Sequence, residues 1–302
     1  MKPAPFDYYA PRTLDEALAL LAEHGGDAKP LAGGQSLIPA MNFRLATPAV
    51  LVDLNAISQL SYVAEENMAA AADNSKRGSL RIGAMTRHHV LERSELVARQ
   101  APLVTMTMPF VAHAAIRTRG TIGGSLAHAD PAAELPAVML ALNATLTLTS
   151  RIGTRTVAAE EFFTSLFTTA LAPGELVTEI EIPSQVPATG YAFHEIARRH
   201  GDFALAGVAV VLEFGASQRI TNARVALLSV GDRPLLAAHA VRALLGQTPT
   251  ADVIRAAAED GATRDIDPPS DIHASSAYRR QLVRVLTRRA LEDACRTRTH
   301  DA

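Results

Sequence analysis

Two short segments place a glycine pair and a serine between apolar residues. They are LAGGQSL, residues 31–37, and TIGGSLAHAD, residues 121–130. Glycine adopts backbone conformations that other residues avoid, and it lets a ligand come close to the main chain. Successive backbone N–H groups in such a turn form a concave anion site, to which a serine hydroxyl adds a further donor. Two turns of this kind from different lobes could hold a diphosphate between them.

Neither segment matches a known phosphate-binding fingerprint. The chain has no Gly-x-x-x-x-Gly-Lys-Ser/Thr, and no Gly-x-Gly-x-x-Gly that opens a helix. Each glycine pair, taken alone, is more typical of an ordinary tight turn than of a ligand site. Both pairs, however, lie between apolar segments and both are followed by Ser-Leu. Together they favour a diphosphate site of a different architecture.

The first glycine pair is expected to follow a short strand in a small lobe. A helix begins after Thr13, because Thr13 and Glu16 have the spacing of a capping box. Its apolar residues recur at helical spacing, which predicts one buried face. The apolar run at residues 49–54 is typical of a second short strand. We therefore expect residues 1–58 to form an α/β lobe.

The second glycine pair lies in a longer region, residues 59–178, that we expect to form a second lobe. Its apolar pattern alternates between short strands and helices, as in a compact α/β unit. The expected elements are a hairpin or loop over 59–77, a strand at 80–85, a helix at 86–100 capped by Thr86, a buried helix at 102–116, a helix at 134–142 and a strand at 144–150.

The last third, residues 179–302, changes character. Four strand-like segments come first, and two or three amphipathic helices follow them. A meander of strands with helices on one face forms an α+β layer. The strand-like segments are LVTEIEIP, YAFHEIARR, FALAGVAVVLEF and RITNARVALLSVG.

Composition limits the class of protein. The chain has 302 residues, 48% of them hydrophobic, and a net charge of −2 from 29 basic and 31 acidic residues. This balance gives no reason to expect nucleic-acid binding. No apolar run reaches the roughly 18 residues of a membrane helix, and the N-terminus has no signal-peptide pattern, so we expect a cytoplasmic protein without a membrane span. The single cysteine, Cys295, cannot hold an iron–sulfur cluster or a structural zinc ion by itself.

Three motifs in order resemble one known family. LAGGQSLIPAMNFRLATPAVLVDL, RTRGTIGGSLAHADPAAELPAVMLAL and RRHGDFALAGVAV are similar to segments of the FAD-binding medium subunit of the molybdenum hydroxylases, which include xanthine dehydrogenase and carbon monoxide dehydrogenase. The resemblance extends over essentially the whole chain. It implies an α+β fold, with a two-lobed FAD-binding domain of the vanillyl-alcohol-oxidase (PCMH) type. It also implies a C-terminal domain of the carbon monoxide dehydrogenase flavoprotein type that covers the flavin.

The resemblance also implies a set of cofactor contacts. Both glycine segments would hold the FAD diphosphate through backbone N–H groups. Asp130 and Glu134 would accept hydrogen bonds from ribose hydroxyls, although an acidic residue here also suits a helix N-cap. Phe193 and His194 would lie near the flavin ring, where some relatives carry a lysine in place of His194; the alternative is a strand with Phe193 in the core and His194 exposed. The expected cofactor-binding residues are Ala32, Gly33, Gly34, Gln35, Ser36, Leu37, Thr121, Ile122, Gly123, Gly124, Ser125, Asp130, Glu134, Phe193 and His194.

The implied function is electron transfer within a larger oxidoreductase. A large partner subunit would hold molybdenum and its pterin, and a small partner would hold two [2Fe–2S] clusters. By analogy with the family, the three subunits would assemble as a dimer of heterotrimers. FAD in this chain would take electrons from the clusters and pass them to an external acceptor. We therefore expect no catalytic acid or base and no metal ligand in this chain. The lone cysteine agrees with this division, because the clusters must then lie on another chain.

Two other functions remain open from the sequence. One is a self-contained FAD-dependent oxidase or dehydrogenase of the same fold, which would need its own substrate pocket. The other is a non-enzymatic module that binds a phosphorylated ligand. The substrate of the whole enzyme is also open between an N-heteroaromatic compound, an aldehyde and carbon monoxide, since the substrate pocket would lie in the large partner.

Overall fold

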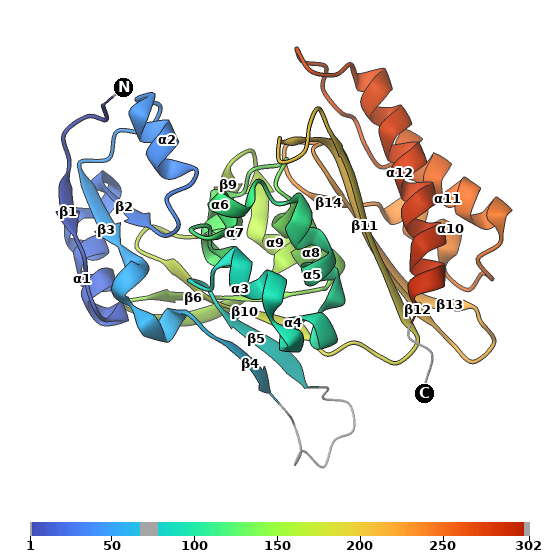
Figure 1. Cartoon of the computed structure of the whole chain (residues 1–302), viewed down its shortest axis with the longest axis horizontal. Helices are drawn as coiled ribbons and strands as arrows, with labels where there is room; N and C mark the ends of the chain where they lie inside the picture. Colours follow the sequence, from blue (N-terminus) through green and yellow to red (C-terminus); the bar gives the residue numbers. More distant parts are fainter. Residues whose placement is uncertain (1, 67–77, 299–302) are drawn as a thin grey trace.

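The computed structural model describes residues 2–66 and 78–298, which form three successive units (Figure 1). The N-terminal unit has a parallel sheet in the order β1 (Asp7–Tyr9), β3 (Val50–Asp53), β2 (Ala28–Leu31). Helix α1 (Leu14–His24) packs an apolar stripe against this sheet, and its capping box between Thr13 and Glu16 is present as predicted. Helix α2 (Leu37–Asn42) follows β2 directly after the first glycine pair.

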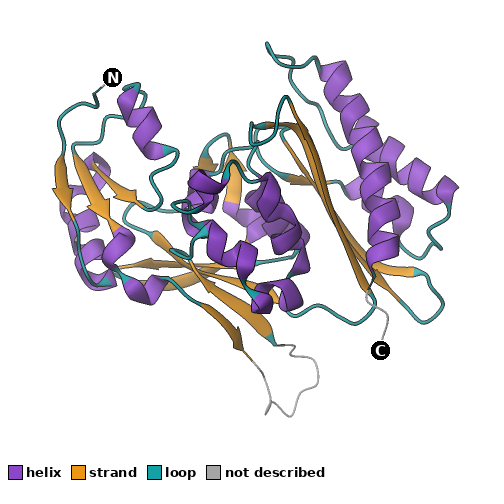
Figure 2. Ribbon diagram, viewed as in Figure 1, coloured by secondary structure: helices purple, strands orange, loops and turns teal. Residues whose placement is uncertain are grey.

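The middle unit has a five-stranded antiparallel sheet with helices on one side (Figure 2). The central strand, β10, pairs with β5 and β6, and the hairpin strands β4 and β7 lie at the edges. Part of the hairpin or loop expected over 59–77 is confirmed, because β4 pairs with β5; residues 67–77 lie outside the described residues. The strands are β4 (Val63–Glu66), β5 (Ser79–Gly83), β6 (Thr145–Ser150), β7 (Gly153–Ala158) and β10 (Leu176–Pro183), with a separate hairpin of β8 (Phe163–Ser165) and β9 (Thr168–Thr169).

The two long helices expected over 86–100 and 102–116 are each divided into shorter ones. Ser94 accepts a hydrogen bond from the backbone N–H of Val97, so it ends one helix and caps the next. Thr86 caps neither helix, because its hydroxyl donates to the carbonyl oxygen of Tyr62. Pro109 cannot continue the second helix, because it lacks an N–H donor. The helices of this unit are α3 (His88–Arg93), α4 (Glu95–Gln100), α5 (Pro102–Thr107), α6 (Ala114–Arg117), α7 (Ile122–His128), α8 (Glu134–Ala141) and α9 (Ala159–Phe162).

The C-terminal unit is an antiparallel sheet between two layers of helices. One face of the sheet carries the unit's own helices, as predicted, and the other face packs on α5 and α8 of the middle unit. The hydrophobic core of the middle unit therefore continues into this sheet. The elements are β11 (Thr189–Ala197), β12 (Ala204–Phe214), β13 (Ile220–Leu228) and β14 (Leu235–Leu236), followed by α10 (Ala238–Leu244), α11 (Ala251–Thr263) and α12 (Ser276–Thr297).

The expected boundary between residues 178 and 179 falls inside β10. All of β10 belongs to the sheet of the middle unit, because it pairs with β5 on one side and with β6 on the other. The change of unit therefore comes after Pro183, in the segment 184–188 that leads to β11. The alternating apolar pattern of this strand is the same in either sheet, which is why the sequence does not reveal its partners.

A glycine in β11 fixes the distance between α12 and the sheet. A side-chain carbon at Gly190 would lie 1.8 Å from the carbonyl oxygen of Ala294, whereas one at Gly26 would meet nothing within 4 Å. We therefore expect Gly190→Ala to lower the free energy of unfolding by about 1–3 kcal/mol, as overpacking does. Gly26→Ala is the matched control and should leave the midpoint of thermal unfolding unchanged. Equal midpoints for both variants would show that α12 does not pack tightly here.

Candidate functional site

The two glycine segments meet where the N-terminal and middle units join. The first links β2 to α2, and the second begins α7. A side-chain carbon at Gly33 would lie 2.5 Å from the carbonyl oxygen of Arg119, and one at Gly124 would lie 3.2 Å from the Cβ of Ala32. Only glycine permits so close an approach at residue 33. The fold therefore brings together the two segments that the sequence singled out.

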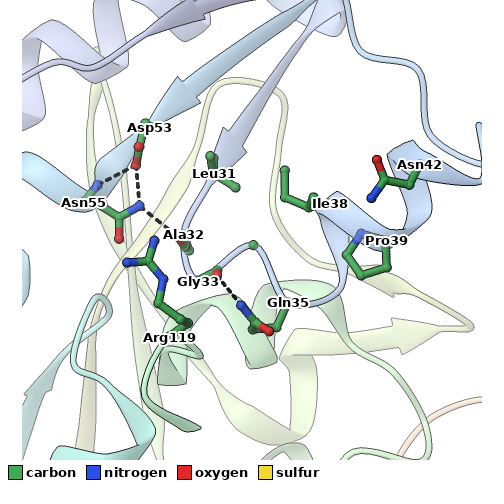
Figure 3. Close-up of a pocket in the computed structure, with 11 residues that line it drawn as sticks. Leu31, Ala32, Gly33, Gln35, Ile38, Pro39, Asn42, Asp53, Asn55 and Arg119 are labelled. Carbon is green, nitrogen blue, oxygen red and sulfur yellow. Dashed lines mark hydrogen bonds between the residues drawn. The ribbon is translucent and has the colours of Figure 1, made fainter. Parts of the chain in front are cut away.

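A cavity of about 330 Å³ opens beside the first glycine segment (Figure 3). Its walls come from the end of β2, from α2, from the turn after β3 and from Arg119 of the middle unit. The site therefore includes side chains from both units. The lining residues are Leu31, Ala32, Gly33, Gly34, Gln35, Ile38, Pro39, Asn42, Asp53, Asn55 and Arg119.

The first glycine segment presents hydrogen-bond donors at this cavity. Within the described residues, the backbone N–H groups from Gly33 to Ser36 donate to no protein acceptor. Gly34 has a φ of +72°, in the left-handed region that favours glycine, and the turn is closed by Gln35, whose Nε2 donates to the carbonyl oxygen of Gly33 at 3.2 Å. Successive N–H donors without a protein acceptor suit an anionic ligand.

The second glycine segment differs from the turn that the sequence suggested. Residues 122–125 form the first turn of α7, and Thr121 is its N-cap. The N–H of Ile122 donates to Thr86, that of Gly123 to the carbonyl oxygen of Ala84 at 2.8 Å, and that of Gly124 to the hydroxyl of Thr121 at 3.1 Å. These donors already have protein acceptors. The expectation that both segments offer free N–H groups is therefore correct only for the first.

Four polar side chains at the junction of the two units were not anticipated from the sequence, namely Asp53, Asn55, Arg87 and Arg119. The carboxylate of Asp53 accepts hydrogen bonds from the hydroxyl of Tyr8 and from the backbone N–H of Asn55, the latter at 2.9 Å. Burial and the nearby charge of Arg119 lower the pKa of Arg87. Two guanidinium groups and one carboxylate thus leave an excess of positive charge at the junction. Arg119 directly precedes the Gly-Thr-Ile-Gly-Gly run, so its position next to that motif was the available signal.

Asp130 and Glu134 lie away from the lining of this cavity; Asp130 is in the segment that joins α7 to α8, and Glu134 is the first residue of α8. Asp130 accepts a hydrogen bond from the backbone N–H of Ala132 at 2.9 Å, while the N-cap of α8 is Ala133. The helix-cap alternative is therefore wrong for Asp130. Glu134 is 8% exposed, and burial raises its pKa to about 7. Both residues are near the C-terminal unit, since the N–H of Ser229 donates to the carbonyl oxygen of Pro131 at 2.8 Å.

Phe193 and His194 point to opposite faces of β11. Phe193 packs against Phe110, with ring centroids 5.1 Å apart, in the core shared with the middle unit. Because side chains alternate along a strand, His194 faces the other way, where its Nε2 lies 2.7 Å from the Oδ2 of Asp293 on α12. The structure therefore brings Phe193, but not His194, to the side of the FAD-binding lobes. The neighbour that shares the face of Phe193 is Glu195.

Comparison with known proteins supports the resemblance seen in the sequence. The family described as "FAD binding domain in molybdopterin dehydrogenase" matches residues 4–185, and "CO dehydrogenase flavoprotein C-terminal domain" matches residues 191–294. The chain belongs to this family of FAD-binding subunits. The change between the two matches falls in the same segment as the change of sheet after β10.

Individual relatives cover nearly the whole chain. The chain is 39% identical to 6-hydroxypseudooxynicotine dehydrogenase complex subunit alpha of Paenarthrobacter nicotinovorans over 97% of this chain and 96% of that protein. It is 41% identical to caffeine dehydrogenase subunit beta of Pseudomonas sp. (strain CBB1), with the same coverage. A solved structure, reconstituted CO dehydrogenase from Oligotropha carboxidovorans, superimposes with a TM-score of 0.92 at 38% identity, covering 98% of this chain and 100% of the matched chain.

These findings establish the class of protein. The chain is the FAD-carrying subunit of a heteromeric oxidoreductase of the molybdenum hydroxylase family, and FAD is its cofactor. The alternatives of a stand-alone oxidase and a non-enzymatic module are not favoured, because the relatives are subunits of multi-subunit enzymes. The residues fit FAD, since a glycine cradle, free N–H donors and an exposed guanidinium meet at one cavity. Among residues 2–66 and 78–298, no three His, Cys, Asp or Glu side chains are grouped to hold a metal ion.

A buried acid, Glu134, and a partly buried one, Glu195, at the junction with the C-terminal unit give a pH-dependent prediction. Burial, reinforced by the charge of Glu134, raises the pKa of Glu195 to about 8. The folded protein therefore retains a proton that the unfolded chain releases above about pH 4.3. Stability should fall as the pH rises from 5 to 8 and then level off, with a slope of up to about 1.4 kcal/mol per pH unit for each retained proton.

Glu195→Gln should remove much of this loss, because glutamine stays neutral in both states. We expect the variant to be more stable than the parent chain by about 1–3 kcal/mol at pH 8 and nearly equal to it at pH 5. Urea unfolding at the two pH values provides the measurement. The exposed Glu23 on α1 supplies a control, Glu23→Gln, which should shift neither value. If Glu195→Gln and the parent chain differed in free energy of unfolding by the same amount at pH 5 and at pH 8, the raised pKa would not belong to Glu195.

Proposed function

We propose that FAD binds across the junction of the N-terminal and middle units, with its diphosphate beside the first glycine segment and Arg119. The observation that carries this proposal is the run of backbone N–H groups from Gly33 to Ser36 that have no acceptor within the described residues and lie at a cavity. A diphosphate accepts hydrogen bonds from such donors, and the guanidinium of Arg119 complements its charge. Ala32 and Leu37 flank this row at the ends of the adjoining elements.

The second glycine segment has a supporting role in this proposal. Residues 121–125 form the surface against which the first segment rests, because Gly124 allows the close approach of Ala32. Asp130, Glu134 and Phe193 lie toward the C-terminal unit, and we assign them to the ribose and ring end of the cofactor. His194 is left out of the site, because β11 directs it toward α12.

The chemistry of the whole enzyme is divided among subunits. When bound, FAD accepts electrons in single steps and delivers them in pairs to an acceptor. This chain's residues hold the cofactor, and they supply no acid or base to the substrate. We propose that electrons come from two [2Fe–2S] clusters of a small partner, and that a large partner holds molybdenum with its pterin. A cytoplasmic dimer of heterotrimers is the proposed assembly.

The comparisons support this division in one respect. Relatives named for caffeine and for 6-hydroxypseudooxynicotine are 41% and 39% identical to this chain. A subunit that aligns over nearly its whole length between enzymes named for different substrates is expected to serve a step common to them. Substrate selection is therefore assigned to the large partner.

No helix in the described part of the chain has the length and apolar character needed to span a membrane.

Cofactor content tests this function directly. The chain, tagged and purified with its partners from the native host, should contain about one FAD, one molybdenum and four irons per copy, since two [2Fe–2S] clusters hold four irons. Flavin and metals are measured on the same sample. Stoichiometric FAD without molybdenum or iron, in a sample that still oxidises a substrate, would contradict the subunit role. A sample that contains both metals but no FAD would contradict the cofactor assignment.

The role of Arg119 can be tested in the same preparation. Its guanidinium lines the cavity, and a charge-assisted hydrogen bond contributes about 1.5–3 kcal/mol. Arg119→Ala should therefore weaken FAD binding about tenfold or more, since 1.4 kcal/mol corresponds to a factor of ten. Titration of the deflavinated protein with FAD gives the dissociation constant. Arg151→Ala, on the exposed connection between β6 and β7, is the control and should leave the constant unchanged.

A further inference from the structure

Two side chains connect the glycine segments to each other. Asn55 follows β3 in the N-terminal unit, and its Nδ2 donates to the carbonyl oxygen of Ala32 at 3.0 Å. Arg87 precedes α3 in the middle unit, and one of its nitrogens donates to the Oδ1 of Asn55. Its other terminal nitrogen donates to the carbonyl oxygen of Arg119. A continuous row of hydrogen bonds thus runs from the first glycine segment to the residue two positions before Thr121.

The position of Asn55 is itself fixed. Asp53 accepts hydrogen bonds from both the backbone N–H and the side-chain amide of Asn55, as Figure 3 shows. The side-chain amide of Asn55 therefore uses its donors on Asp53 and Ala32 and its oxygen on Arg87. Since every hydrogen-bonding atom of this amide is engaged, Asn55 has one favourable orientation.

Arginine is the residue type that this geometry requires. Its planar fork donates to two acceptors in fixed directions, whereas a lysine ammonium acts as a compact point charge. Arg87 and Asn55 are both partly buried, so water competes less for the hydrogen bonds of the Asn55 amide than it would at the surface. The segments pack so closely that a side-chain carbon at Gly33 would lie 2.5 Å from the carbonyl oxygen of Arg119. A small change in the separation of the segments would therefore displace the donors at the cavity.

We propose that Asn55 and Arg87 form a strap that holds the two glycine segments at the separation that the FAD diphosphate requires. Neither residue donates to the cofactor in this account, so both are positioning residues. The inference rests on the proposed location of FAD. It assigns to this pair the alignment of the two glycine segments at the junction of the units.

A double-mutant cycle on FAD affinity tests the strap. The full-length chain is deflavinated, and dissociation constants for FAD are measured for the parent chain, Asn55→Ala, Arg87→Ala and the double variant. Each single variant should weaken binding about tenfold. The double variant should bind FAD no more weakly than the single variant with the lower affinity, because each substitution already breaks the same row of hydrogen bonds.

Two further variants separate alignment from charge and from general stability. Arg87→Lys keeps the charge but not the fork, and it should bind FAD about as weakly as Arg87→Ala. Arg155 on β7 donates to the carbonyl oxygen of Ala170 and to Glu175, both at 2.7 Å, so it is similarly engaged but distant from the glycine segments. Arg155→Ala should leave the FAD dissociation constant unchanged, even if it lowers the unfolding midpoint.

The outcomes distinguish the strap from the proposed function. If the parent chain binds FAD and the strap variants bind it equally well, the strap is wrong while the FAD site stands. Full recovery of affinity in Arg87→Lys, or additive losses in the double variant, would also overturn it. If the parent chain itself fails to bind FAD, the proposed function fails first. If Arg87→Ala does not fold, the FAD dissociation constants of Asn55→Ala and Arg87→Lys are compared with that of the parent chain instead.

Discussion

The close approach of Gly33 to the backbone of Arg119 and Gly120 is the contact on which the site depends. A side-chain carbon at this position would overlap the carbonyl oxygen of Arg119. At this point the N-terminal and middle units meet through bare backbone, and a cavity lined by both units lies beside the contact. Gly33 and Gly124 are therefore explained mainly by the close packing of the two segments. The earlier idea that both pairs exist to expose N–H groups to phosphate explains only the first segment.

Electrostatics at the same junction favour an anion. Arg87 and Arg119 lie close enough for the charge of Arg119 to lower the pKa of Arg87, and Asp53 compensates only part of their charge. The guanidinium of Arg87 is engaged by Asn55 and by the carbonyl oxygen of Arg119, whereas the side chain of Arg119 lines the cavity. One arginine thus aligns the units and the other is available to the diphosphate. This division of roles follows from hydrogen bonds between residues more than thirty positions apart.

Much of the fold and part of the site could be predicted from the sequence. The capping box at Thr13, the strand and helix content and the meeting of the two glycine segments were anticipated, because local patterns or a family resemblance carried them. Local patterns did not reveal that Ser94 and Pro109 divide two helices, or that β10 belongs to the middle sheet. The partners of a strand are long-range information.

The same limit applies at the site. The motif predicts His194 near the flavin, whereas strand alternation directs its side chain toward Asp293. Asn55 and Arg87 belong to no fingerprint, and their importance depends on a contact between units that no short segment contains. The free N–H groups of the first segment and the engaged ones of the second could be distinguished only once their acceptors were placed.

The most direct test is an experimental structure of the chain with FAD bound. We expect diphosphate oxygens within hydrogen-bond distance of at least two backbone N–H groups between Gly33 and Ser36, with the guanidinium of Arg119 alongside. The N–H of Gly123 should still donate to the carbonyl oxygen of Ala84. A diphosphate that instead lies away from this segment, with the Gly33–Ser36 donors facing solvent, would contradict the central claim.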